Sequence, residues 1–178
     1  MKNKQSLYKW LYDTYENDLF SYGIAFGISK ELLEDAIHDV FLHLYEREHK
    51  LWESQNMKFY LLNCLKNRIR TIKKKEMNTE FLEDNYSFLI EVNGFELIYE
   101  EKERAAMQKQ LKKMLDSLTD RQREAVYLRY TQGLSYEEIG KLMGIQPKAA
   151  QKLVYRAIEQ MRKIQPQIIY FFLFGYFL

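Results

Sequence analysis

The stretch from residue 118 to residue 163 constrains the fold of this chain most strongly. Ser135 and Glu138 are spaced as a capping box at the start of a short apolar helix, because each side chain can bond to the backbone amide of the other residue. Gly144 then permits a left-handed turn, and Pro147 suits the first position of a further helix, where its missing N–H costs nothing. A capped short helix, a glycine turn and a longer second helix predict a helix-turn-helix.

The last helix of this stretch has an apolar face and a basic face. Between residues 146 and 163 there are five Lys or Arg residues and one acid, Glu159. A solvated helix face normally mixes the two signs, so this imbalance favours a surface that faces phosphates. A helical hairpin without DNA binding remains the alternative on this pattern alone. The predicted faces are Ala150, Leu153, Val154, Ala157, Ile158 and Met161 for the core, and Lys148, Lys152, Tyr155 and Arg156 for the surface.

Composition is consistent with a soluble, all-α protein. The 178 residues are 47% hydrophobic and 29% charged, which is enough for one domain or two small ones. Two prolines and the lack of an alternating strand pattern favour helices throughout. The net charge of +2 does not itself favour nucleic acid, but acidic and basic residues lie in separate blocks, and the local field matters more than the total.

No catalytic or metal-binding pattern is present in the sequence. Cys64 is the single cysteine, so a disulfide within the chain is excluded, and the histidines have no zinc-site spacing. We expect no cofactor and no enzymatic activity. Charges throughout the first 18 residues argue against a signal peptide and favour a cytoplasmic location.

Two helices of opposite charge are predicted in the first half. Residues 31–48 have an acidic face, which is either an ordinary solvated face or a docking surface for a basic partner. Residues 57–75 contain seven Lys or Arg residues and no acid. Their polar face, opposite an apolar stripe, consists of Asn63, Asn67, Arg70 and Lys74. Cations contact phosphates, and amides and aromatic rings can contact exposed bases, so this helix is predicted to be a second nucleic-acid surface.

The predicted organisation is two small helical domains joined by an acidic linker. The first domain covers residues 1–75 and the second, with the helix-turn-helix, residues 104–164. Residues 76–103 contain nine acids and one base, as expected of a solvated tether that apolar residues such as Phe88 anchor in places. Residues 165–178 form an apolar, aromatic tail, too short to cross a bilayer alone.

Three motifs in order resemble the extracytoplasmic-function (ECF) group of bacterial RNA polymerase sigma factors. Residues 34–45, EDAIHDVFLHLY, resemble the D-x-x-Q-E-V-F-x-x-x-W helix of the family's second conserved region. Residues 59–67 resemble the W-L-x-x-I-A-x-N helix that follows it, and residues 118–156 resemble the fourth conserved region. Departures from the usual residues are Tyr60 for Trp, Thr71 for Asp, Ala149 and Ala150 for Thr-Val, and Leu153 for Arg.

The resemblance implies a protein that binds core RNA polymerase and directs transcription from promoter DNA. It implies core polymerase binding by Asp35, Asp39, Val40, Phe41 and Leu44. It implies contacts with the melted −10 element by Tyr60, Asn63, Asn67, Arg70, Lys73 and Lys74. It implies contacts with the −35 duplex by Lys148, Ala149, Gln151, Lys152, Tyr155 and Arg156. An anti-sigma factor would be a further partner.

Two other classes of function remain open at this point. One is a helix-turn-helix regulator that binds duplex DNA without joining polymerase. The other is a membrane-peripheral adaptor that uses the aromatic tail. For the tail itself, three interpretations stand: extra core, a docking strip for a regulator, or contact with a membrane interface, where Phe and Tyr are well accommodated.

Overall fold

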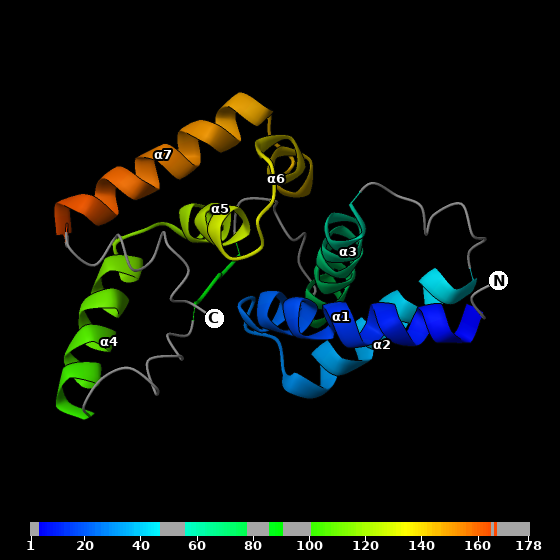
Figure 1. The fold of residues 1–178 in the computed structure, drawn as a ribbon. Coiled ribbons are helices and arrows are strands. Elements are labelled where there is room, and N and C mark those ends of the chain that lie inside the picture. The colour runs from blue at the N-terminus through cyan, green and yellow to red at the C-terminus, as the bar shows by residue number, and fades with distance from the viewer. Residues whose placement is uncertain (1–3, 47–55, 78–85, 91–100, 165, 167–178) are drawn as a thin grey trace. The chain divides into compact units, whose positions relative to one another are not determined.

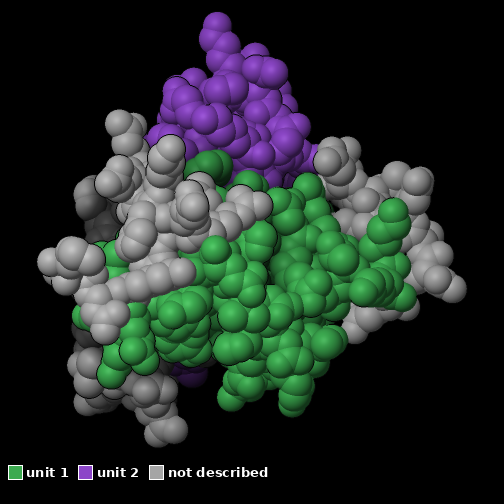
Figure 2. Space-filling view, turned by 90° about the vertical axis from the view of Figure 1, so that its right-hand side faces the viewer, with its two compact units in different colours: residues 1–87 green, residues 88–178 purple. Residues whose placement is uncertain are grey.

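The chain folds into helices, as predicted. The structure is a computed structural model that describes residues 4–46, 56–77, 86–90, 101–164 and 166. Within these ranges it contains seven α-helices and no strand (Figure 1). The chain divides into two compact units, residues 1–87 and 88–178 (Figure 2). The tail at residues 168–178 lies outside the described residues, so the three interpretations of it remain predictions.

Unit 1 is a bundle in which α1 (Lys4–Ile24), α2 (Lys30–Glu46) and α3 (Met57–Met77) pack against one another. The Ser29 hydroxyl accepts the N–H of Leu32 at 3.3 Å and so caps the start of α2. An aromatic cluster joins α1 to α2: the Tyr12 and Phe41 ring centres are 4.8 Å apart, and Tyr8 contacts Phe41 edge-on at 6.1 Å. The fully buried side chains include Leu19, Tyr22, Leu33, Phe41, Leu44, Leu61, Leu65 and Ile69.

Unit 2 is built on its longest helix, α7 (Pro147–Ile164). Helices α5 (Asp120–Tyr130) and α6 (Tyr136–Met143) pack on α7, and α4 (Glu101–Asp116) also contacts it. The core of unit 2 comprises Leu111, Met114, Leu118, Val126, Leu128, Ile139, Ala150, Val154, Ala157 and Met161. Burial of this apolar surface is the main source of stability for a small helical domain.

Capping residues define the starts of the helices in unit 2, and the predicted starts of α6 and α7 are confirmed. Thr119 begins α5 through a capping box with Gln122, and Ser135 begins α6 through a capping box with Glu138. Each box satisfies two backbone amides that would otherwise lack partners. Helix α7 begins at the expected proline.

Two glycines allow the tight turn between α6 and α7. Gly144 ends α6 with φ +67, a conformation that costs other residues energy. A Cβ atom at Gly140 would lie 2.7 Å from the backbone oxygen of Ile145, so a side chain there would force the turn apart. The helix-turn-helix geometry therefore depends on the backbone as well as on the core.

Part of the predicted linker is ordered against the two units. Residues 86–90 have no regular secondary structure, yet Tyr86 and Phe88 are buried, with 9% and 0% of their surface exposed. Tyr86 packs in unit 1 and Phe88 in unit 2. The described segment is thus anchored at two side chains, one of them the Phe88 that the sequence offered as an anchor.

Candidate nucleic-acid interface

Helix α7 presents a continuous polar and cationic face. All six residues that were predicted to contact the −35 duplex are exposed: Lys148, Ala149, Gln151, Lys152, Tyr155 and Arg156. The Tyr155 ring is 62% exposed, which is unusual for a large aromatic side chain. Lys152 is four positions from Lys148 and Arg156 and three from Tyr155, so these side chains lie on one side of the helix.

The opposite side of α7 holds the helix in place. Five of the six predicted core residues are buried, and the sixth, Leu153, is half-buried at the edge of the packed face. Lys148, Lys152 and Arg156 make no ion pair within the described part of the chain. Their charge is therefore available to an anionic ligand.

Helix α3 presents its predicted nucleic-acid face less completely. Asn67 and Lys74 are exposed, whereas Tyr60, Asn63 and Arg70 are half-buried. The ammonium of Lys73 donates a hydrogen bond to the backbone carbonyl of Phe26, in the turn that follows α1. Lys73, one of the six predicted contacts, thus has a structural partner within unit 1, which helical spacing alone did not reveal.

Three further cations of α3 interact inside unit 1. Lys58 pairs with Asp18 at 2.8 Å, and Arg68 pairs with Asp39 at 2.5 Å. Lys66 is 3% exposed and lies against aromatic rings. The sequence has seven basic residues and no acid between residues 57 and 75, but several of these cations make contacts within unit 1.

Helix α2 shows which of the implied polymerase contacts are accessible. Val40, Phe41 and Leu44 are 6%, 0% and 0% exposed and belong to the core of unit 1. Asp35 is exposed, and Asp39 is partly exposed beside Arg68. The large apolar side chains exposed on this helix are Leu42 and Tyr45, at 44% and 37%. Neither was predicted as a polymerase contact, because the resemblance implied Val40, Phe41 and Leu44 instead.

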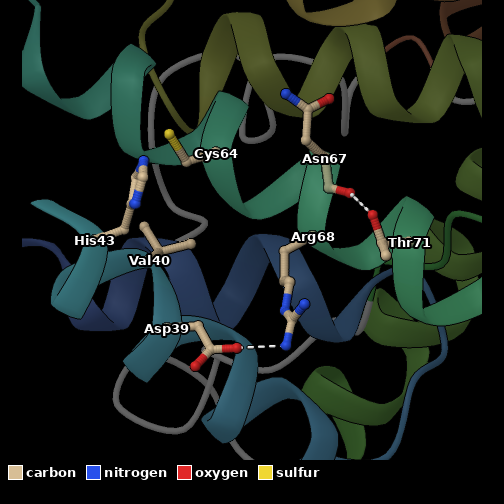
Figure 3. Close-up of a pocket in the computed structure, with 7 residues that line it drawn as sticks. All are labelled: Asp39, Val40, His43, Cys64, Asn67, Arg68 and Thr71. Carbon is tan, nitrogen blue, oxygen red and sulfur yellow. Dashed lines mark hydrogen bonds and ion pairs between the residues drawn. The ribbon is translucent and has the colours of Figure 1, made fainter.

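A pocket of about 400 Å³ lies between α2 and α3 (Figure 3). It is lined by Asp39, Val40 and His43 from α2, and by Cys64, Asn67, Arg68 and Thr71 from α3. The Asp39–Arg68 ion pair crosses it, and the Thr71 hydroxyl donates to the backbone carbonyl of Asn67 at 3.0 Å. The pocket therefore adjoins both the implied polymerase surface and the implied −10 surface.

In unit 2, residues of α5 form hydrogen bonds with the backbone of the linker residue Phe88. The N–H of Phe88 donates to the Asp120 carboxylate at 2.8 Å, and the Arg123 guanidinium donates to the Phe88 carbonyl at 2.8 Å. Arg123 also pairs with Asp120 at 2.7 Å. Partial burial would raise the pKa of the Asp120 carboxyl, but the bonds from Phe88 and Arg123 outweigh burial and hold the pKa below its ordinary value.

The described residues contain neither a metal-binding cluster nor a membrane-spanning helix. Among them, no three His, Cys, Asp or Glu side chains gather in a way that could hold a metal ion. Within the same residues, no helix has the length and apolar character needed to span a membrane.

The sequence matches known proteins along most of its length. Residues 108–161 match the family Sigma-70, region 4. The ECF RNA polymerase sigma factor SigM of Bacillus subtilis (strain 168) is 22% identical over 158 residues, 86% of this chain and 92% of that protein. The ECF RNA polymerase sigma factor ShbA of Streptomyces griseus is 38% identical over 56 residues, 32% of this chain and 29% of that protein.

Solved structures share the fold. One is the sigma factor RpoE in complex with the anti-sigma factor NepR from Bartonella quintana, with a TM-score of 0.62 at 18% identity, covering 90% of this chain and 97% of that one. Another is CnrH in complex with the cytosolic domain of CnrY, with a TM-score of 0.57 at 16% identity, covering 93% and 90%. The match of residues 108–161 shows a Sigma-70 region 4 in this chain, and the curated relatives show that the chain is similar to ECF RNA polymerase sigma factors. The two solved structures show that it shares their fold.

Proposed function

We propose that this protein binds core RNA polymerase and recognises a promoter at two places. Helix α7 contacts the major groove of the −35 duplex, and α3 contacts the single strand of the melted −10 element. The observation that carries this proposal is the face of α7, where six adjacent polar, cationic and small residues are exposed on a helix fixed by its apolar side. A helix fits the major groove, where side chains reach base edges.

On α7 the residues divide by chemistry. Lys148, Lys152 and Arg156 supply positive charge for phosphates or for guanine edges. Gln151 can bond to adenine, and Ala149 leaves room for a thymine methyl group. The exposed ring of Tyr155 adds apolar surface beside them.

On α3 we assign the −10 contact to the exposed residues Asn67 and Lys74, with Tyr60, Asn63 and Arg70 at the edge. Asparagine amides can bond to splayed bases, and aromatic rings can stack on them. Binding to exposed bases stabilises the open strand relative to the duplex, so the protein promotes melting without catalysing a reaction. Lys73 is assigned to the α1 turn, because its ammonium bonds to Phe26.

The polymerase contact is assigned to the exposed side of α2. Asp35 offers charge, and Leu42 and Tyr45 offer apolar surface that a protein partner would bury. Val40, Phe41 and Leu44 support this face from below. Leu42→Asp should weaken binding to core polymerase by about tenfold while leaving the fold intact, because this position is solvent-exposed. Unchanged binding would show that core polymerase contacts a different surface of the protein.

These roles place the protein in the cytoplasm, with promoter DNA and polymerase as partners. Because the sigma factor RpoE was solved with an anti-sigma factor, a regulator of this kind is also proposed for this chain.

Run-off transcription tests the proposed function. The purified chain is added to core polymerase with a library of promoter templates, and transcripts are compared with those made by core alone. Promoter-dependent transcripts of defined start are expected. A chain that binds duplex DNA but does not co-purify with core would instead be a free helix-turn-helix regulator.

A further inference from the structure

Lys66 lies in the middle of α3 with 3% of its surface exposed. Its ammonium nitrogen is 5.3 Å from the centre of the Tyr86 ring and 5.9 Å from the centre of the Phe26 ring. The two rings also contact each other, with centres 5.6 Å apart. The faces of aromatic rings attract cations, so the rings hold this ammonium away from bulk solvent.

The two rings are carried by different kinds of structure. Phe26 follows α1, is 2% exposed, and is held through its carbonyl by Lys73. Tyr86 belongs to the irregular segment 86–90, in which its neighbour Ser87 and the apolar Leu89 are exposed. Phe26 is thus a fixed part of the bundle, whereas the Tyr86 ring belongs to the linker segment.

Lys66 borders the proposed −10 face. It is three residues after Asn63 and four before Arg70, and residues at these spacings are neighbours on a helix surface. Asn67 beside it is exposed. A lysine has a long, flexible stem, so its ammonium can turn from the rings to this face without any change of backbone.

We propose that Lys66 is a phosphate-binding residue of the −10 face, and that Tyr86 keeps it covered until the linker segment leaves α3. The inference rests on the nucleic-acid role proposed for α3. With the segment in place, the face lacks one cation. With the segment drawn away, Lys66 contacts the strand backbone, and the position of the linker sets how strongly α3 binds nucleic acid.

The salt dependence of binding provides the test, because each new phosphate contact adds a defined increment to the slope of log affinity against log salt concentration. The full chain is titrated with a fluorescein-labelled single-stranded oligothymidine, and anisotropy is measured between about 50 and 200 mM salt. Tyr86→Ala should bind about fivefold more tightly near 0.1 M salt, with a log–log slope steeper by about 0.7. Tyr86→Phe keeps the ring and should match the wild type, as should Leu89→Ala, which alters an exposed residue of the same segment.

The double variant Tyr86→Ala, Lys66→Gln identifies the cation. It should return to the wild-type affinity and slope, because the residue that was uncovered is neutral. A gain that persists in the double variant would overturn the proposal. Tyr86→Ala could unfold the segment because it removes the whole ring. Tyr86→Leu keeps apolar contact with Phe26 but lacks a π face, so it should show the same steeper salt slope in that case. Circular dichroism checks that each variant is folded.

Lys74→Glu separates failure of this inference from failure of the proposed function. If it weakens binding while Tyr86→Ala and Tyr86→Leu behave as wild type, α3 binds nucleic acid and the cover on Lys66 has no such role. If Lys74→Glu has no effect, the nucleic-acid role of α3 itself is wrong. Absence of binding by the wild type and both Tyr86 variants at the lowest salt would reject both.

Discussion

Helices α7 and α3 are both rich in Lys and Arg, but they present that charge differently. On α7, Lys148, Lys152 and Arg156 are all exposed along one face. On α3, at least four basic side chains contact other parts of unit 1: Lys58, Lys66, Arg68 and Lys73. The number of cations in a helix therefore does not give the charge that the helix offers to DNA.

The difference follows from how much of each helix is packed. The cationic face of α7 lies opposite its contacts with the rest of unit 2, so the apolar period separates core from surface cleanly. Helix α3 packs on both α1 and α2. The segment that contains Tyr86 covers another side of α3, at Lys66. More of its circumference is occupied, so its cations meet carboxylates, a carbonyl and aromatic rings.

The largest effect is expected on α7, where a single charge reversal should disable promoter recognition. Lys152→Glu places an acid on the exposed cationic face, and binding of a −35 duplex should fall by more than about tenfold, in line with roughly 1–3 kcal/mol for a base or phosphate contact. Promoter-dependent run-off transcription reports the loss. Core polymerase binding should be unchanged, because the polymerase surface is assigned to unit 1. Lys109→Glu, exposed on α4, is the matched control; equal loss of core binding in Lys152→Glu would contradict the division of roles.

A pair of substitutions on α3 sharpens the comparison. Lys74→Gln removes an exposed cation, so binding of a −10 single strand should weaken about fivefold near 0.1 M salt and its salt slope should fall by about 0.7. Lys58→Gln removes a cation that is already paired with Asp18, so neither quantity should change. Anisotropy titrations on holoenzyme at several salt concentrations measure both. Equal losses would mean that the ion pair opens in the complex and that α3 presents more charge than the free protein shows.

Much of unit 2 could be predicted from the sequence because its determinants are local. The capping boxes at Thr119 and Ser135, the turn at Gly144 and the start of α7 at Pro147 each depend on residues within four positions. Helical period alone predicted that Lys148, Lys152, Tyr155 and Arg156 are exposed, whereas Ala149 and Gln151 came from the resemblance. Local rules and tertiary packing agree here, so the side chains predicted to be on the surface of α7 are exposed.

Unit 1 and the linker were harder to predict because their key contacts are distant in sequence. Lys73 bonds to Phe26, Arg68 pairs with Asp39, and Phe88 is held by residues of α5 more than thirty positions away. Helical spacing says which residues share a face, but it does not say that a cation on that face has a partner. The sequence motif around Phe41 also does not reveal whether an apolar residue packs in the core or contacts a partner protein. In the structure Phe41 is buried in the core.

A smaller effect is expected from the ion pair between α2 and α3. Arg68→Gln breaks a pair whose side chains are 44% and 45% exposed, so the free energy of unfolding should fall by no more than about 1 kcal/mol. Chemical denaturation followed by circular dichroism measures it. The same variant frees the Asp39 carboxylate, so its affinity for core polymerase should be equal or higher. Weaker core binding would show that Arg68, rather than Asp39, contacts polymerase.

The smallest effect concerns how unit 2 holds the linker, and it depends on pH. The folded pKa of Asp120 lies below its ordinary value of 3.8, so the stabilisation from its carboxylate is complete above about that pH and is lost as the pH falls through the lowered folded pKa. The Asp120 side chain is 39% exposed and solvent screens the charge, so the loss of stabilisation should be at most about 1 kcal/mol, or about fivefold in exchange rate.

Hydrogen exchange of the Phe88 amide, corrected for its intrinsic rate, should therefore accelerate below pH 3.8 while the buried Val154 amide of α7 stays protected. In Asp120→Asn the charge is absent, so exchange at Phe88 should be faster at neutral pH and should no longer vary across this range. If the wild type and this variant show the same pH profile, the acid sensitivity arises elsewhere and the grip on Phe88 depends on Arg123 and on apolar packing against Tyr127.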